Sequence, residues 1–383
     1  MKKYARIKEI GKVITGKTPS TENEDNFGGD FPFITPSDIS TFDEKYIAET
    51  ERTISSKGYK KLKNNLLPMN SVCFVCIGST IGKMCLTNKP SFTNQQINAL
   101  LVNKNYDSQY VFYLLRYVKG YFQQIGAGTG SGKGIVNKST FEKSRICVEK
   151  DLFFQKKIAS ILSAYDDLIE NNNKRIKILE QMAENLYKEW FVRFRFPGHE
   201  TAEFENGIPK GWKVVRVKNC LKRLPFNRLC KQDELESSGK VIVIDQSSNE
   251  FMGFHNNEPS HYASFEDPII LFGDHSCKFV LMTKNFSLGE NVVPFRSINT
   301  EELDNYYLYY AVHKLIVTEE YKRHWGRFTA MKFFKPQINL QKKFAEFVKQ
   351  LVHKKEMLWI QNQNLIKQRD LLLPRIMSGK LEV

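Results

Sequence analysis

The sequence predicts an α+β protein with two similar mixed α/β domains separated by two long antiparallel coiled-coil helices. Three observations predict this fold class. Residues 155–196 carry apolar side chains at alternating steps of four and three, which is the seam of a coiled coil. The segment QKKIA that opens this stretch at 155–159 returns as QKKFA at 341–345. Strand-like and helix-like stretches precede both copies in a similar order, which indicates duplication of a whole domain.

Each of the two long segments is expected to be a continuous helix. Neither Pro nor Gly interrupts the first before Pro197 and Gly198, so it should extend for about 50–60 Å and require a partner. An Asn in each seam favours one register. Two unrelated surface helices would leave the shared QKK unexplained. The seam residues are Ile158, Leu162, Tyr165, Ile169, Asn172, Ile176, Leu179, Ala183, Leu186 and Trp190, then Phe344, Val348, Leu351, Lys355, Leu358, Asn362, Leu365, Arg369, Leu372 and Ile376.

The remaining pattern divides the chain into four segments. These are a first domain at 1–150, a central long helix at 151–196, a linker with the second domain at 197–339, and a C-terminal long helix and tail at 340–383. Short apolar runs bounded by Gly, Pro, Asn and Ser predict strands at 31–34, 71–77, 97–102, 141–148, 241–244 and 268–272. Helical spacing is present at 110–125 and 300–325, and residues 326–335 are interpreted as a polar loop.

Composition narrows the class of partner. The chain has 383 residues and a formal net charge of +15, which favours a polyanion or an anionic surface. The seven cysteines are scattered, as is typical of a reducing compartment. No apolar run follows the N-terminal lysines and none reaches the length of a membrane span, so we expect a cytoplasmic protein without membrane contact.

The glycine-rich loop at 126–134 resembles a nucleotide-binding loop but lacks two of its residues. The pattern requires Gly where Ala127 stands and a hydroxyl residue where Gly134 stands. The loop also follows a helical stretch, whereas a nucleotide loop leads from a strand into a helix. Two interpretations stay open, a plain surface turn and a loop whose Thr129, Ser131 and Lys133 contact phosphates.

Other apparent motifs do not form a catalytic or metal site. Cys73 and Cys76 lie three apart in a strand-like run, so they should point to opposite faces and be core thiols, not zinc ligands. Asp304 with residues 320–322 matches the D…ExK nuclease pattern, but both parts have helical spacing. The chain has no Pro-Pro pair, so the Asp/Asn-Pro-Pro-aromatic motif of amino-methyltransferases is absent. We therefore expect no enzyme, no bound cofactor and no metal.

Several stretches of the chain are distinctive: LEQMAENLYKEWFVRFRFPG at 179–198, GIPKGWKVVRV at 207–217 and LLLPRIMSGKLEV at 371–383. Less specific stretches are ITGKTPS at 14–20, FITPSDI at 33–39, IGSTIGK at 77–83 and TNQQINAL at 93–100. Together they resemble the specificity (S) subunit of type I restriction–modification enzymes, and the resemblance covers essentially the whole chain. The family often has Pro just before the Gln that opens each long helix; Pro336 fits this pattern before Gln341, but the segment VEKDLFF at 148–154 before Gln155 contains no Pro.

This resemblance implies a non-catalytic DNA-recognition subunit. Two target-recognition domains would each read half of a split sequence in double-stranded DNA, and the helices would act as the spacer. Methyltransferase (M) subunits, two in number, would bring S-adenosylmethionine, and restriction/translocase (R) subunits would use ATP and Mg²⁺. The aromatic side chains Tyr187, Phe191 and Phe194 at the end of the first seam are expected to be exposed and to bind a methyltransferase subunit.

Candidate DNA-contacting residues follow from side-chain chemistry within these segments. Asn and Gln can pair with adenine and Arg with guanine, while Lys, Ser and Thr can hold phosphates. Alternatively, Gln95 and Gln96 only satisfy backbone groups at a strand edge. The candidates are Lys17, Thr18, Ser37, Ser79, Thr80, Lys83, Asn94, Gln95, Gln96, Thr129, Ser131, Lys133, Asn137 and Lys138 in the first domain, and His275, Ser276, Arg327, Thr329 and Lys332 in the second.

Two other classes of function remain as alternatives. One is a fused restriction–methylation enzyme, against which the missing motifs and the chain length argue. The other is a coiled-coil scaffold or a non-specific DNA-binding protein, for which the basic charge would serve solubility or phosphate contact alone. Neither needs two similar domains with polar loops.

Overall fold

The computed structural model describes residues 2–39, 45–47, 49–128, 134–247, 249–317 and 323–383. They form two compact units, and unit 2 is inserted into unit 1 along the chain. Unit 1 consists of Met1–Asn173 and Ile360–Val383, and unit 2 of Lys174–Trp359. Two long helices, α6 (Leu152–Tyr187) and α9 (Ile338–Ser378), each contribute a segment to both units.

Unit 1 contains a four-stranded antiparallel sheet in the order β2-β8-β5-β6, a three-stranded sheet β4-β3-β7 and a ribbon β1-β9. In the three-stranded sheet β3 and β7 are parallel. The strands are β1 (Lys2–Arg6), β2 (Gly11–Thr15), β3 (Phe27–Ile34), β4 (Arg52–Ile54), β5 (Val72–Val75), β6 (Met84–Leu86), β7 (Phe92–Thr93), β8 (Ile97–Val102) and β9 (Arg145–Glu149).

The side chains of β5 alternate between two hydrophobic clusters. Cys73 belongs to one cluster, whereas Phe74 and Cys76 belong to the other. Period-two alternation along a strand places residues three apart on opposite faces. The prediction that Cys73 and Cys76 are core thiols on opposite faces is therefore confirmed.

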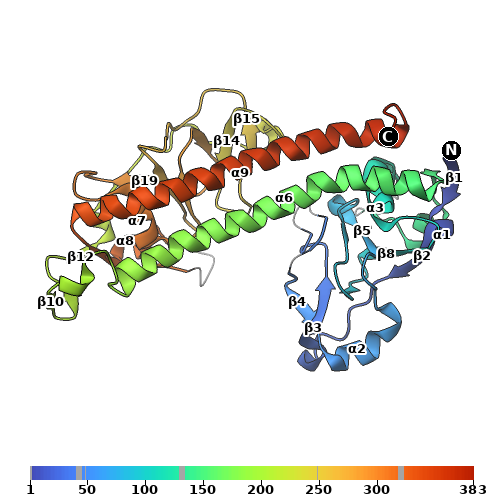
Figure 1. Ribbon diagram of the computed structural model, residues 1–383, viewed down its shortest axis with the longest axis horizontal. Helices are drawn as coiled ribbons and strands as arrows, with labels where there is room; N and C mark the ends of the chain where they lie inside the picture. The colour runs from blue at the N-terminus through green and yellow to red at the C-terminus, as the bar shows by residue number, and fades with distance from the viewer. Residues whose placement is uncertain (1, 40–44, 48, 129–133, 248, 318–322) are drawn as a thin grey trace. The chain divides into compact units, whose positions relative to one another are not determined.

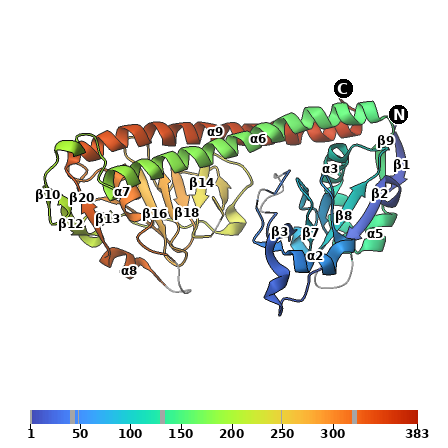
Figure 2. The same ribbon diagram turned by 60° about the horizontal axis from the view of Figure 1, so that its bottom comes forward.

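The helices of unit 1 begin at polar caps. Asp107 accepts a hydrogen bond from the backbone N–H of Tyr110 at 2.9 Å and so starts α3. Ser55 and Asn137 cap α2 and α5 in the same way. The helices are α1 (Ile7–Ile10), α2 (Ser56–Leu62), α3 (Ser108–Tyr117), α4 (Lys119–Ala127) and α5 (Lys138–Lys143). In Figure 2, α3 lies between α6 and the strands of unit 1.

Unit 2 repeats this connectivity. Its sheets have the orders β13-β19-β16-β17, β15-β14-β18 and β12-β20, and β14 and β18 are again parallel; β10-β11 is an additional hairpin. The strands are β10 (Phe204–Glu205), β11 (Ile208–Pro209), β12 (Lys213–Arg216), β13 (Leu221–Arg223), β14 (Val241–Ile244), β15 (Gly253–His255), β16 (Ile269–Gly273), β17 (Phe279–Met282), β18 (Phe286–Leu288), β19 (Val292–Ser297) and β20 (Lys332–Lys335). Its domain helices are α7 (Asn305–Val312) and α8 (Trp325–Ala330).

The matching strand orders confirm that the chain duplicates a mixed α/β domain followed by a long helix. The sheet β2-β8-β5-β6 corresponds to β13-β19-β16-β17, and β4-β3-β7 corresponds to β15-β14-β18. The helices α3 and α5 correspond to α7 and α8.

In each unit a segment of α6 lies beside a segment of α9, and the two run antiparallel (Figure 1). Every predicted seam residue is buried or half-buried, which confirms the seam. In the cross-helix pairs, residue numbers fall in α6 as they rise in α9. These pairs are Trp190 with Phe344, Glu180 with Lys355, Asn172 with Asn362, and Asp166 with Arg369.

The two seam asparagines lie in the same layer of unit 1. The Asn172 amide donates to the Asn362 side-chain oxygen at 2.9 Å, and the Asn362 amide donates to the side-chain oxygen of Asn173 at 2.8 Å. Polar pairing of this kind fixes the register of a helix pair, since a slipped register would bury the amides without these partners.

The aromatic residues at the end of α6 pack within unit 2, so their predicted exposure is wrong: Phe191 is buried, and Tyr187 and Phe194 are half-buried. Phe191 is 1% exposed and contacts the ring of Tyr307 at a centroid distance of 4.7 Å. Tyr187 contacts Phe344. Phe194 is half-buried with φ of +58°. The α-helix gives way to a wider turn, Lys188–Val192, and ends before Pro197. A helix pair alone would leave these rings exposed, but Tyr307 of α7 contacts both Tyr187 and Phe191.

Three sequence-based element predictions need correction. Of the helical spacing predicted at 300–325, the described residues form only α7 and the first residue of α8, and residues 318–322 lie outside the described residues. Residues 141–148 were expected to be a strand, but the first three belong to α5 and only β9 is extended. The expected polar loop at 326–335 forms most of α8 and all of β20. The start of α8 depends on a distant loop, since the Asp274 carboxylate accepts from the backbone N–H groups of His324 (3.0 Å) and Trp325 (2.8 Å). Local sequence does not contain that contact.

Candidate nucleic-acid interface

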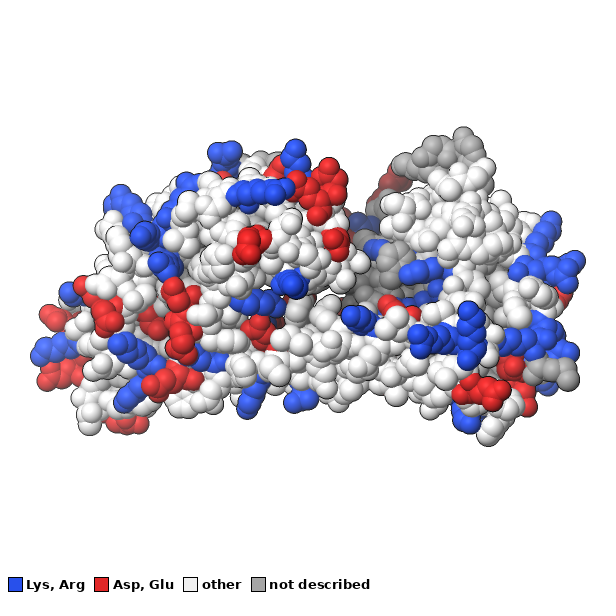
Figure 3. Space-filling view, turned by 90° about the horizontal axis from the view of Figure 1, so that it is seen from above, with Lys and Arg blue, Asp and Glu red and all other residues white. Residues whose placement is uncertain are grey.

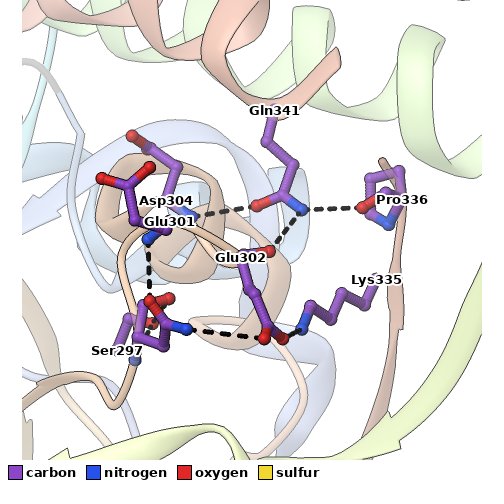
Figure 4. A network of polar contacts seen from close by, with 8 residues as sticks. Ser297, Glu301, Glu302, Asp304, Lys335, Pro336 and Gln341 are labelled. Carbon is purple, nitrogen blue, oxygen red and sulfur yellow. Dashed lines mark hydrogen bonds and ion pairs between the residues drawn. The ribbon is translucent and has the colours of Figure 1, made fainter. Parts of the chain in front are cut away.

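A buried glutamine near the start of α9 joins the domain of unit 2 to its long helix (Figure 4). The Gln341 side-chain oxygen accepts from the backbone N–H of Asp304 at 3.0 Å. Its amide donates to the carbonyls of Pro336 (2.7 Å) and Glu302 (3.2 Å). Since Asp304 caps α7 and Pro336 follows β20, one side chain fixes the helix start, the strand end and the long helix together.

Gln155 makes the equivalent contacts in unit 1. Its side-chain oxygen accepts from the backbone N–H of Asp107 at 2.8 Å, and its amide donates to the Glu149 carbonyl at 2.9 Å. Asp107 caps α3 and Glu149 ends β9. We call Gln155 and Gln341 the junction glutamines. The junction glutamines therefore lie where each domain joins its long helix.

Three loops of unit 1 meet at the end of the sheet remote from its junction glutamine. β8 leads from Ile97 toward the α3 cap, so the loop at 94–96 lies at the other end of that strand. The Cys76 N–H donates to the Gln96 carbonyl at 2.9 Å, and the Val136 N–H donates to the Cys76 carbonyl at 2.8 Å. The segments around residues 76, 96 and 136 therefore form one continuous edge.

A pocket of about 390 Å³ opens at this edge and brings four predicted site residues together. The predicted residues are Thr18, Ser37, Asn94 and Gln96, and the rest of the lining is Phe33, Thr35, Pro36, Asp38, Glu51 and Arg52. The Asp38 carboxylate is engaged within the loop, because it accepts from the backbone N–H groups of Thr35 and Glu51, both at 2.7 Å. Hydroxyl, amide and guanidinium groups thus share a polar recess.

The three residues at 94–96 have different roles in the structure. Asn94 shapes the loop, since its side-chain oxygen accepts from the Gln96 N–H at 3.1 Å and its amide lies 3.3 Å from the Gln96 side-chain oxygen. Gln95 is exposed, and its side-chain oxygen accepts from the Thr18 hydroxyl at 2.7 Å. The alternative gave the role of satisfying backbone groups to Gln95 and Gln96, but the side chain that accepts from a backbone N–H here is that of Asn94. The side chains of Gln95 and Gln96 instead contact those of Thr18 and Asn94, and the Gln95 amide group can still donate to an outside acceptor.

The other predicted DNA-contacting residues of unit 1 are either exposed or hydrogen-bonded within the domain. Lys17, Ser79 and Lys138 are exposed. Thr80 and Lys83 are engaged within the domain, since the Thr80 hydroxyl donates to the Ile77 carbonyl and the Lys83 ammonium to the Ile39 carbonyl, both at 2.9 Å. Asn137 caps α5 by accepting from the Thr140 N–H at 2.9 Å. Thr129, Ser131 and Lys133 lie outside the described residues.

The predicted DNA-contacting residues of unit 2 lie on the loop after β16, on α8 and on the β12-β20 ribbon. His275 and Ser276 belong to the loop after β16, and Asp274 of that loop caps α8, which carries Arg327 and Thr329. Ser276 and Arg327 are exposed, and His275 is half-buried. The Thr329 hydroxyl donates to the Gly326 carbonyl at 3.1 Å. Lys332 is exposed but lies on β20, in the β12-β20 ribbon.

Sequence reasoning missed the residues of unit 2 that correspond to the loop at 94–96. Thr93 pairs with Ile34 just before that loop, and Leu288 pairs with Ile244 in the same parallel register. The corresponding loop is therefore 289–291, with sequence Gly-Glu-Asn. The equivalence of the two loops can be seen only from the pairing register of the parallel strands, which no sequence motif reveals. Arg52 in the pocket was also missed.

The charged side chains on one face of the molecule are mixed in sign. On the face drawn in Figure 3, Lys and Arg side chains are spread among Asp and Glu side chains instead of forming one patch. In the ranges that the structure describes, no group of three or more His, Cys, Asp or Glu could hold a metal ion, and no helix is long and apolar enough to cross a membrane.

Comparison with known proteins identifies the family. Residues 2–181 match the type I restriction modification DNA specificity domain. The MjaIX specificity subunit of Methanocaldococcus jannaschii, a type I restriction enzyme subunit, is 28% identical over 99% of this chain and 93% of its own length. The first part of the chain therefore matches a type I DNA specificity domain, and nearly the whole chain is similar to a type I specificity subunit. The HindI specificity subunit of Haemophilus influenzae is 32% identical over 44% of this chain and 37% of its own length.

A solved structure shows the same fold as this specificity subunit. The type I restriction–modification S subunit of M. genitalium has a TM-score of 0.55 and 15% identity, covering 98% of this chain and 96% of that one. The function that follows from the family is DNA recognition.

Proposed function

We propose that this specificity subunit reads a bipartite target in double-stranded DNA, one half with each domain. The observation that carries the proposal is the repeated edge, because residues 94–96 and 289–291 occupy the same loop of a duplicated domain. Their side chains differ, so the two half-sites are expected to differ in sequence.

Catalysis belongs to partner subunits in this proposal. Two methyltransferase subunits supply S-adenosylmethionine and dock on the outer faces of α6 and α9, and restriction subunits supply ATP and Mg²⁺. The chain itself contributes recognition and binds none of these cofactors. Support comes from the relatives, which are specificity subunits of type I restriction enzymes, and from Ala127 and Gly134, which break the nucleotide-loop pattern.

The long helices serve as the ruler between the half-sites. Two helices paired through fixed layers, including the Asn172–Asn362 layer, resist sliding, because sliding breaks every layer of the seam. The distance between the two recognised halves then becomes part of the target sequence. An insertion in both helices is the direct test.

We predict that four residues inserted into both helices, beside the Asn172–Asn362 layer, widen the unspecified gap by one or two bases. Each helix lengthens by about 6 Å, close to two base-pair steps. The measurement is whole-genome sequencing of methylated sites in cells that carry the complete methyltransferase complex. A control variant changes four exposed residues of α6 without changing its length, and its gap should equal that of the wild type.

Three results would contradict the proposal. A wild-type complex without a defined methylated motif would favour a scaffold or a non-specific DNA-binding protein. A motif without two separated halves would contradict bipartite reading. An unchanged gap in an insertion variant that still methylates DNA would show that the helices are not the ruler.

A further inference from the structure

The loops at 94–96 and 289–291 correspond residue by residue. Each has three residues between the parallel strand and the first residue of the next strand, which is Ile97 in unit 1 and Val292 in unit 2. The Asn94 N–H donates to the Ile34 carbonyl at 3.3 Å, and the Gly289 N–H donates to the Ile244 carbonyl at 2.9 Å. The first positions of the two loops are thus equivalent.

The last positions are equivalent by a second pair of hydrogen bonds. The Cys76 N–H donates to the Gln96 carbonyl at 2.9 Å, and the Asp274 N–H donates to the Asn291 carbonyl at 2.8 Å. Val75 and Gly273, the residues before these donors, pair with the first residue of β8 and of β19 respectively. The middle positions, Gln95 and Glu290, are fixed between two matched ends.

These middle residues are the exposed ones that differ most in chemistry. Gln95 and Glu290 are both exposed. A glutamine amide offers a donor and an acceptor, and it pairs with the N7 and N6 edge of adenine. An ionised glutamate only accepts, and the base edge that suits it in the major groove is the N4 amino group of cytosine. Gln95 and Glu290 cannot read the same base in the same way.

We propose that Gln95 and Glu290 are specificity-determining residues, Gln95 selecting adenine in one half-site and Glu290 selecting cytosine in the other. This inference rests on the proposed DNA-reading function. A carboxylate near DNA is repelled by the phosphates, so Glu290 at this edge requires a donor on the DNA. Gly289 also fits this arrangement, because a Cβ there would lie 2.9 Å from the Asp245 Cβ and the loop packs closely against that residue.

The test exchanges the two side chains within the complete methyltransferase complex and sequences the methylated motif. Glu290→Gln should change a single position of one half-site from cytosine to adenine and leave the other half unchanged. Gln95→Glu should change adenine to cytosine at a single position of the other half. Preference for the original base over the new one should fall by about 5- to 150-fold in each case.

Glu258→Gln is the matched control. Glu258 is exposed and follows the end of β15, which is antiparallel to β14, so it lies at the end of that sheet remote from residues 289–291. The control removes the same charge and should leave the motif unchanged. A variant that methylates too weakly to sequence is instead assayed for binding to duplexes carrying each of the four bases at the affected position.

The outcomes separate the inference from the function on which it rests. A wild-type complex without any motif overturns the proposed function. A wild-type motif that neither exchange alters overturns the inference alone. Equal loss of binding to all four bases at the affected position also overturns the inference, because it assigns the residue to phosphate contact or to loop structure. A shift at one position, in one half only, supports it.

Discussion

In unit 1 the seam between α6 and α9 contains a buried ion pair, whereas in unit 2 the equivalent positions are apolar. Arg369 is fully buried and its guanidinium contacts the Asp166 carboxylate, which also accepts from the Tyr113 hydroxyl. Alignment of the junction glutamines matches Asp166 with Val352 and Arg369 with Ala183. The aromatic cluster around Phe191 and Phe344 packs the seam of unit 2 instead.

The difference shows that the duplicated domains and the helix seam are specified differently: backbone contacts hold each domain to its long helix, whereas side chains determine the packing of the seam. In both units the junction glutamine accepts from the N–H of the residue that caps the domain helix and donates to a carbonyl at the end of the last strand, and backbone groups of this kind do not depend on side-chain identity. The seam depends on side chains and has diverged. In unit 1 the buried ion pair specifies register together with the Asn172–Asn362 layer, since Arg369 displaced from Asp166 would be a buried charge without that carboxylate. In unit 2 register is specified by the shapes of packed rings.

The largest expected effect comes from removing the buried ion pair between Arg369 and Asp166 in unit 1. Arg369→Leu leaves the Asp166 carboxylate buried without its cation, which should lower the stability of unit 1 by about 3–5 kcal/mol. Denaturant unfolding combined with hydrogen exchange in each unit measures the loss. Lys355→Ala is the control, because Lys355 pairs with Glu180 at 2.8 Å in a partly exposed site, and it should cost below about 1 kcal/mol.

A double variant sharpens this test. Arg369→Leu combined with Asp166→Leu removes both charges, and unit 1 should regain most of the stability that the single variant loses. A double variant as unstable as Arg369→Leu alone would show that shape, and not charge, holds this part of the seam.

The next effect in size concerns the shared frame. Gln341→Ala leaves the Asp304 N–H and the Pro336 carbonyl buried without that partner and should cost unit 2 about 2–3 kcal/mol. Gln155→Ala should cost unit 1 a similar amount. Hydrogen exchange at the amides of α7 and α3 reports each loss. The exposed neighbours Lys342 and Lys156 provide Ala controls, and equal weakening of both units by either Gln variant would contradict a local role.

The smallest effect is a difference in acid sensitivity. All seven histidines of the chain lie between residues 199 and 353, inside unit 2. Burial lowers the pKa of His261, and burial also lowers the pKa of His313 against the opposing effect of Glu184. The unfolded chain therefore binds more protons below about pH 6.5, so the stability of unit 2 is complete above that pH and falls as the pH falls below it.

Unit 1 has no histidine and should keep its stability over the same interval, down to the range where carboxylates titrate. Unfolding of the two units followed between pH 7 and 5.5 measures the difference. His261→Gln should reduce the acid sensitivity of unit 2, and His353→Gln, at an exposed position of α9, should not. A parallel decline of both units would assign the effect to other groups.

Sequence alone predicted the parts of the fold that depend on local periodicity. The seam and the duplication were predicted because spacing and the QKK repeat are visible in one dimension. The start of α8 could not be predicted, because its cap is Asp274 from a distant loop. The burial of Phe191 depends on α7, which a helix pair considered alone omits. Glu290 was missed because its equivalence to Gln95 exists only in the strand register.

The insertion of unit 2 within unit 1 has a consequence for synthesis of the chain on the ribosome. All of unit 2 is translated before residues 360–383, which complete unit 1. Until then Ile158 and Leu162 of α6 lack Leu373 and Ile376 of α9, which belong to the same hydrophobic cluster, and exposed apolar surface of this kind is a target for chaperones. The unit that comes later in sequence is therefore the first whose residues have all been synthesised.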